Sequence, residues 1–175
     1  MPAAPALPRW TWWLPLPLFH LATWLALASQ FADGAALLYV PFALALVLCL
    51  WWGPRVLPAM YLNALLSIPL WGLDWQWAPL YALPETMGVG LAWLLLRGPA
   101  FDAALPNLPA LLRFSALGAL FPVLLVSVGV QGNLWLTGYL PTENLVVGVL
   151  SLVLADSLTS LAIATPFLVY LTPWL

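Results

Sequence analysis

Long apolar runs are the feature that most restricts how this chain can fold. The stretch "ALLYVPFALALVLCLWW" holds no charged residue, and the stretch "LVVGVLSLVLADSLTSLAIATPFLVYL" holds a single one. A helix needs about 20 apolar residues to cross a bilayer, so the 175 residues have room for about six spans with short links. The chain is 65% hydrophobic and 6% charged, which excludes an ordinary soluble domain. We expect helices, because backbone polar groups find no partners in lipid.

The predicted fold is a single integral membrane domain over residues 1–175, an all-α bundle of about six transmembrane helices. The predicted transmembrane helices are 12–30, 35–52, 54–71, 78–96, 108–130 and 145–171. The first run is interpreted as a retained helix rather than a cleaved signal peptide, since its length suits a span. Membrane helices tolerate proline, so kinks are predicted at Pro41, Pro58, Pro84 and Pro122. The link "QGNLWLTGYLPTENL" is expected to lie along the membrane surface as a lid.

Charged residues between the apolar runs predict the orientation in the membrane. The basic residues are all arginines, and all of them fall on one side of the six-span arrangement: Arg9, Arg55, Arg97 and Arg113. Three of the acids between the runs fall on the opposite side: Asp33, Asp74 and Glu143. Under the positive-inside rule, both termini are therefore cytoplasmic. So few basic residues leave no electrostatic basis for binding nucleic acid.

Two carboxyl groups lie inside predicted spans, where an ionised carboxylate costs about 2.5–3.5 kcal/mol on insertion scales. They are Glu85 in the fourth span and Asp156 in the sixth. Residues with such a cost usually face the bundle interior, so a binding or switching role is one interpretation. The alternative is that they hold helices together, as polar side chains often do in membranes. Pro84 also lacks an N–H, so the carbonyl of Leu80 is expected to lose its helical partner near Glu85.

The candidate ligand-binding residues are Glu85, Asp156, Asn63, Ser160 and Trp93. Ser160 lies one helical turn after Asp156 and shares its face, Asn63 lies midway along the third span, and Trp93 lies inside the fourth.

No catalytic, metal or cofactor site is expected from this sequence. The single histidine, His20, and the single cysteine, Cys49, stand apart from one another and from the acids. Nucleophilic catalysis would need an activated side chain with a base within reach, and no such constellation is present. We therefore expect no enzymatic activity and no cofactor.

Three stretches carry a family resemblance. They are "YVPFALALVLCLWWGPRVLPAMYLNALL" (39–66), "ETMGVGLAWLLLRGPAFDAALPNLPALLRF" (85–114) and "LADSLTSLAIATPFL" (154–168). In order and spacing they resemble the membrane-associated sensor domain of the first MASE type, over roughly residues 35–170. The residues in the first stretch that match are Tyr39, Pro41, Gly53, Arg55, Pro58 and Asn63. The chain departs from the family in its expected six helices rather than about eight, in Tyr39 for a usual Trp, and in Ala155 for a usual Gly.

The resemblance implies a sensory or ligand-recognition module of a bacterial signal-transduction protein, multi-pass in the inner membrane. That family forms the membrane part of histidine kinases and cyclic-di-GMP enzymes. It implies a small-molecule ligand, a cytoplasmic output domain or partner membrane protein, and a signal relayed through the last helix; a homodimer is also consistent with it. No kinase or cyclase domain follows Leu175, so an excised sensor or a stand-alone relative is expected.

Two other functions remain open from the sequence. Length, span number and cytoplasmic ends are similar to the substrate-binding subunit of an energy-coupling-factor type vitamin transporter. Such a subunit docks its transport partner through small residues on the first helix, and the counterparts here are Ala22, Ala26 and Ala28. The remaining interpretation is a structural one, in which the bundle serves only as an anchor and dimerisation unit.

Overall fold

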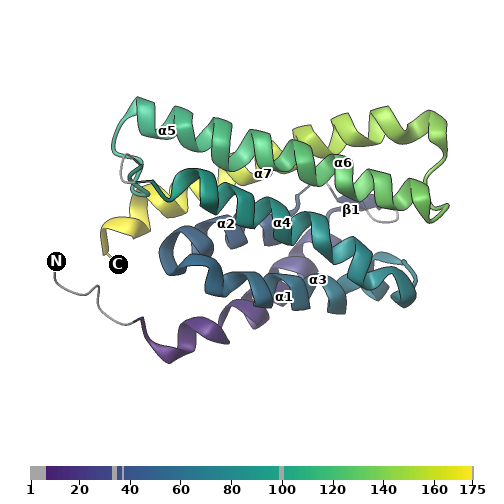
Figure 1. Ribbon diagram of the computed structural model, residues 1–175, viewed down its shortest axis with the longest axis horizontal. Coiled ribbons are helices and arrows are strands. Elements are labelled where there is room, and N and C mark those ends of the chain that lie inside the picture. The colour runs from purple at the N-terminus through teal and green to yellow at the C-terminus, as the bar shows by residue number, and fades with distance from the viewer. Residues whose placement is uncertain (1–6, 33–34, 37, 99–100, 175) are drawn as a thin grey trace.

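The computed structural model describes residues 7–32, 35–36, 38–98 and 101–174 of the chain, so Asp33 lies outside the described residues. The described part is a helical bundle with one short antiparallel pair of strands, β1 (Gln30–Ala32) and β2 (Ala35–Ala36) (Figure 1). Its α-helices are α1 (Pro15–Leu27), α2 (Val40–Trp52), α3 (Leu57–Ser67), α4 (Ala78–Leu96), α5 (Leu108–Phe114), α6 (Phe121–Leu136) and α7 (Leu145–Leu171).

Short turns of tighter or wider helix join these elements. The 3₁₀ segments are η1 (Arg9–Trp12), η2 (Gly53–Val56), η3 (Ile68–Trp71), η4 (Trp75–Trp77), η6 (Thr142–Asn144) and η7 (Thr172–Trp174). A π-helical segment, η5 (Ser115–Leu120), connects α5 to α6 without a break in the helical path.

Four helical segments among the described residues are long and apolar enough to cross a membrane. They are Val40–Trp71, Trp75–Leu96, Leu108–Leu136 and Thr142–Trp174, while Pro15–Leu27 is apolar but shorter. This confirms the coarse prediction of a helical bundle whose apolar helices could span a membrane, since such helices satisfy their own backbone groups in lipid.

The first of these segments folds back on itself. Gly53 has φ 76° and ψ −167°, a conformation that favours glycine, and it ends α2. Tyr39 lies just before α2 and Trp71 at the end of η3, and their ring centroids are 6.0 Å apart. The two helices of the Val40–Trp71 segment therefore form an antiparallel pair rather than one long helix.

The observed helix bounds differ from the predicted ranges mainly at loops and prolines. α4 and α7 coincide with predicted ranges 78–96 and 145–171. Pro41 and Pro58 occupy the first turn of α2 and α3, where a missing N–H breaks no hydrogen bond, so the kinks predicted there are wrong. Pro122 likewise stands in the first turn of α6, directly after the π-helical segment, whereas Pro84 lies inside α4.

The link between the last two spans, residues 131–145, was predicted to be a lid along the membrane surface, and its first six residues instead continue α6. α6 continues through Leu136, so residues 131–136 belong to the helix that packs against α4 and α7. The chain then turns through Gly138, whose φ is 82°, and η6 leads into α7.

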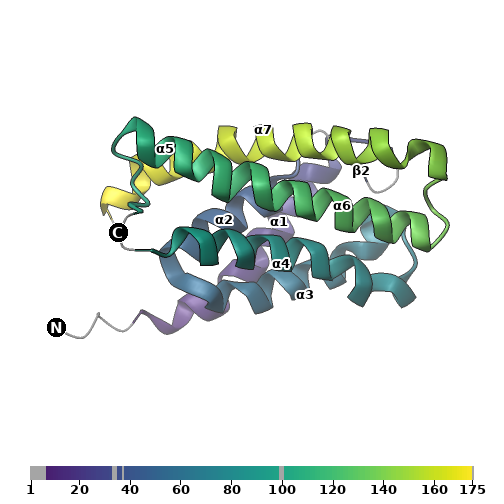
Figure 2. The same cartoon turned by 45° about the horizontal axis from the view of Figure 1, so that its top comes forward.

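α2 lies at the centre of the bundle and packs against α1, α4 and α7. α3 packs against α1 and α4, and α6 packs against α4 and α7, as Figure 2 shows. The contact of α4 with α6 depends on Gly88, because a Cβ at that position would come within 2.2 Å of Val126 Cγ2. Gly88 therefore allows the two helices to approach closely, whereas a Cβ on Gly90 would only touch the end of Leu57 at 3.4 Å.

All four arginines lie at one end of the bundle. Arg55 in η2 lies over the ring of Trp12 at 5.5 Å from the centroid, beside Arg9 in η1. Trp51 Nε1 donates to Thr172 Oγ1 at 2.9 Å, which places the end of α7 there too.

The remaining two arginines flank the link between α4 and α5 at the same end. A Cβ on Gly98 would lie 3.7 Å from the guanidinium of Arg113, and Arg97 lies over the ring of Trp93. Thr172 Oγ1 donates to the carbonyl of Ala103, so this link contacts the end of α7. The opposite end carries Asp74, whose backbone N–H donates to the hydroxyl of Tyr139.

Candidate functional site

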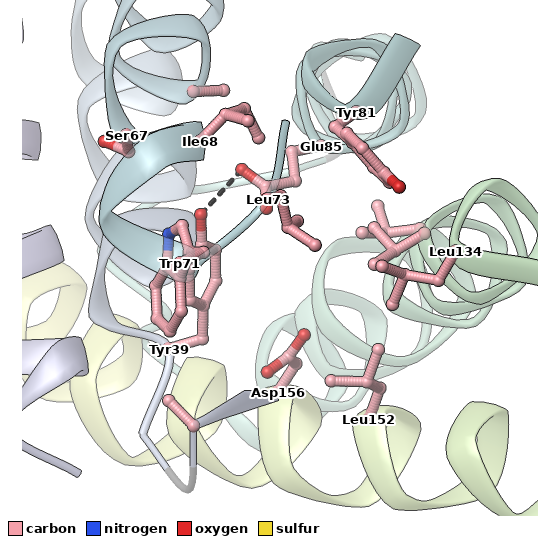
Figure 3. A pocket seen from close by; sticks show the side chains of 14 residues that line it. Tyr39, Ser67, Ile68, Trp71, Leu73, Tyr81, Glu85, Leu134, Leu152 and Asp156 are labelled. Carbon is pink, nitrogen blue, oxygen red and sulfur yellow. Dashed lines mark hydrogen bonds between the residues drawn. The ribbon is translucent and has the colours of Figure 1, made fainter. Parts of the chain in front are cut away.

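A cavity of about 70 Å³ lies inside the bundle, toward the end opposite the arginines. Residues from the start of α2, the end of α3, the link before α4, and helices α4, α6 and α7 line it. Glu85 from α4 and Asp156 from α7 both belong to this lining, and their carboxyl groups point into the same space (Figure 3). The two acids that the sequence singled out therefore meet at one cavity.

Glu85 is held by a hydrogen bond from a distant part of the chain. The Tyr39 hydroxyl donates to Glu85 Oε2 at 2.7 Å, across 46 positions of sequence (Figure 3). Tyr39 itself immediately precedes α2, and its ring lies against Trp71 at an interplanar angle of 51°. The start of α2, the end of η3 and the middle of α4 are thus fixed to one another around the cavity.

Asp156 is differently placed, because one of its oxygens has no partner. The side chain is 6% exposed, and Oδ1 makes no hydrogen bond to any group in the described part of the protein. A buried polar atom without a partner costs roughly 1–3 kcal/mol, and native proteins contain few of them. Asp156 therefore lines the cavity and carries a buried acceptor without a partner, at a cost in stability.

The face of α7 that carries Asp156 is the polar face of that helix. Ser157, Thr159 and Ser160 are all buried beside it, whereas Leu154 and Leu158 are each 65% exposed. In a soluble protein this arrangement would be inverted; in lipid the apolar side chains can face outward. The Thr159 hydroxyl donates a hydrogen bond to the carbonyl oxygen of Ala155, in the preceding turn of the same helix, at 2.8 Å.

The carbonyl that Pro84 leaves without its helical partner is used by a neighbouring helix. Asn133 Nδ2 in α6 donates to the carbonyl oxygen of Leu80 at 2.9 Å. The sequence predicted the freed carbonyl one turn before Glu85, but it did not identify the donor. This bond connects α4 to α6 and satisfies the carbonyl that Pro84 leaves free.

Three of the predicted site residues lie away from this cavity. Asn63 is fully buried in α3 and donates to Thr23 Oγ1 in α1 at 3.1 Å, so it connects two helices. Ser160 is fully buried on α7 but does not line the cavity. The guanidinium carbon of Arg97 lies over the Trp93 ring, 5.1 Å from the ring centroid, at the end of the bundle that carries the arginines. The structure thus brings together Glu85 and Asp156 and places the other three elsewhere.

Aromatic residues form much of the remaining wall, and sequence reasoning did not assign them to the site. They are Tyr39, Trp71 and Tyr81. Tyr81 is 5% exposed, and its hydroxyl is hydrogen-bonded to Thr137 of the α6 end. The only signal available was the position of these aromatic residues near the predicted end of a span, and that position is equally typical of residues at the membrane interface.

The chemistry of the cavity is that of an acceptor-rich and aromatic site. Its lining contains no arginine or histidine, and all four arginines lie at the other end of the bundle. Among the described residues, no group of three or more His, Cys, Asp or Glu side chains could hold a metal ion. The arrangement can accept hydrogen bonds from a bound molecule and can stack against its apolar parts.

Comparisons with known protein families, with curated proteins and with solved structures found no match for this chain.

Proposed function

We propose that this protein is a membrane-embedded ligand-recognition module that binds a small molecule between Glu85 and Asp156. The observation that carries the proposal is the placement of two carboxyl groups from different helices on one cavity, with Asp156 Oδ1 lacking a partner in the described structure. A carboxyl group that served only to hold helices together would be expected to use its acceptors on neighbouring helices. A buried carboxyl group that costs free energy inside a span is better explained by a ligand that binds to it.

In this proposal the signal leaves through α7. Asp156 lies near the middle of this helix, and farther along it Ala164 and Leu168 are fully buried in a cluster with Phe114 and Leu96. A ligand that binds two arrangements of α7 unequally would shift the population between them. The end of α7 is where a cytoplasmic output domain or partner protein would then receive the change. This relay is what the resemblance to sensor domains of the first MASE type also implies.

The proposed topology has six spans, with η1 and α1 as the first and both termini in the cytoplasm of a bacterial cell. It is supported by the location of all four arginines at one end of the bundle. A Cys49→Ala background would allow single cysteines to be introduced at Arg55 and Glu143. A membrane-impermeant maleimide should then label position 143 in intact cells and position 55 only after lysis. Labelling in the reverse order would overturn the orientation.

Ligand binding itself is tested by thermal shift of the purified protein against metabolite pools. Wild type, Asp156→Ala and the control Glu143→Gln are compared; Glu143 is exposed and lies outside the cavity. We expect at least one pool to raise the Tm of wild type and of the control but not of Asp156→Ala. An identical response of all three proteins would remove Asp156 from the site.

The burial of two alanines in α1 weakens the alternative of a transporter subunit. Ala22 and Ala26, two of the three small residues predicted to dock a transport partner, are 3% and 0% exposed inside the bundle. The outward side of α1 is instead formed by larger residues, including Leu21, Trp24 and Leu25. Co-purification with a partner membrane protein and ATPases would be needed to restore this alternative.

A further inference from the structure

We propose that the ligand of this cavity is a small primary amine bound in its ammonium form. The inference rests on the proposed ligand-recognition function and adds the chemical class of the ligand. It stands on the acceptor groups, the aromatic wall, the absence of basic residues from the lining, and the size of the cavity.

The acceptors of the cavity match the donors of a primary ammonium group. The Asp156 carboxyl group points into the cavity (Figure 3), and its Oδ1 is buried without a partner in the described part of the chain. Among the described residues, Glu85 accepts a hydrogen bond from Tyr39 through Oε2, and the Tyr39 oxygen keeps a lone pair after donating that bond. A primary ammonium has three N–H donors and no acceptor, so it can use all of these groups at once. Buried carboxylates are stabilised when a cation pairs with them.

The wall of the cavity suits a cation with a short apolar chain. Trp71 is 7% exposed and Tyr81 is 5% exposed, and both line the space together with Leu134 and Leu152. Aromatic faces attract a desolvated cation by about 2 kcal/mol or more. An anionic ligand would instead meet two acids and no basic residue, because the arginines lie at the other end.

The size of the cavity restricts the ligand further. Its volume of about 70 Å³ corresponds to roughly five or six water positions, which fits a molecule of about as many non-hydrogen atoms. A hard metal ion is a poorer match: Ca²⁺ takes about six to eight oxygen ligands, whereas most of this lining is apolar. Short alkylamines and amino alcohols therefore fit best.

The test measures the Tm of the full chain in lipid nanodiscs with a matched set of probes at constant ionic strength. Propylamine and ethanolamine carry the predicted group, 1-propanol is the neutral analogue, propionate is the anion, and tetramethylammonium is a cation without N–H donors. Sodium and calcium chloride test for a metal ion. We expect the two amines to raise Tm and the other probes to leave it unchanged. An equal rise with tetramethylammonium, 1-propanol or calcium would overturn the assignment of a primary amine.

Variants locate the amine at the cavity. Titration calorimetry with propylamine should show affinity that is about 10-fold to 100-fold weaker for Asp156→Asn, since a charge-assisted hydrogen bond is lost. Glu85→Gln should weaken binding in the same direction, and Tyr39→Phe offers a third route if either acid variant fails to fold. Glu143→Gln should bind like wild type. Unchanged affinity in the folded Asp156 and Glu85 variants would overturn the site.

The two proposals fail in distinguishable ways. If metabolite pools shift wild type but not Asp156→Ala while no amine shifts either protein, the ligand-recognition function stands and the amine class is overturned. If no pool and no amine produces a shift that depends on Asp156, the ligand-recognition function is overturned together with the amine.

Discussion

Replacing Asp156 by leucine separates a ligand site from a packing role. At 1.5 Å per residue, Asp156 lies about 16 Å from the start of α7 and about 22 Å from its end, well inside a span. Oδ1 has no partner among the described residues, and such a buried polar atom costs about 1–3 kcal/mol. If the carboxylate is ionised at this depth, its insertion cost is about 2.5–3.5 kcal/mol.

Leucine removes this cost but is larger than aspartate, because two methyl groups replace two carboxylate oxygens. Its side chain has the same number of non-hydrogen atoms as that of aspartate, and the adjoining cavity of about 70 Å³ gives it room, so overpacking should be small. We therefore expect Asp156→Leu to raise the free energy of unfolding by about 1–3 kcal/mol, while ligand binding is lost. Asp156→Asn should be at least as stable as wild type.

The assay is unfolding of the purified protein by SDS titration and by heat, followed by tryptophan fluorescence and circular dichroism. Ser160→Ala is the matched control: this side chain is also buried on α7 and has no partner in the described residues, but it does not line the cavity. The control should keep the ligand response. A loss of about 1 kcal/mol or more in Asp156→Leu would refute the reasoning, because the carboxyl group would then be making a stabilising contact between helices.

Two further predictions concern the contact between α4 and α6. Gly88→Ala should destabilise the protein by about 1–3 kcal/mol in SDS titration, because the added Cβ would come within 2.2 Å of Val126 Cγ2. Gly90→Ala is the control and should stay close to wild type, because its Cβ would lie 3.4 Å from the nearest atom of Leu57. Asn133→Leu should cost about 0.6–1.7 kcal/mol by leaving the Leu80 carbonyl without its donor, and an unchanged Tm would show that this hydrogen bond contributes nothing measurable.

The character of the fold could be predicted from the sequence, because the physics of lipid restricts the options so strongly. Apolar runs of span length lead to helices, and α4 and α7 coincide with two of the predicted ranges. The freed Leu80 carbonyl followed from the missing N–H of Pro84 and needed no knowledge of neighbours. The expectation that buried acids face inward also followed from the cost of placing them in lipid.

Positions of individual prolines and loops were less predictable. A proline is compatible with the first turn of a helix and with its interior, and only the path of the chain decides between them. Pro41 and Pro58 therefore begin helices where the sequence predicted kinks. The first six residues of the predicted lid continue α6 for a similar reason, since its apolar residues suit a helix inside the bundle as well as a segment along the membrane surface.

By itself, the sequence determined that this chain forms apolar helices and that Glu85 and Asp156 are costly residues inside them. Only the tertiary structure decided that these two acids share one cavity, that Tyr39 donates to Glu85 from 46 positions away, and that Asn63 instead connects α3 to α1. The physical reason is that lipid and protein interior are similarly apolar. An apolar side chain gains little from facing either one, so the residue pattern of a membrane helix does not specify its neighbours.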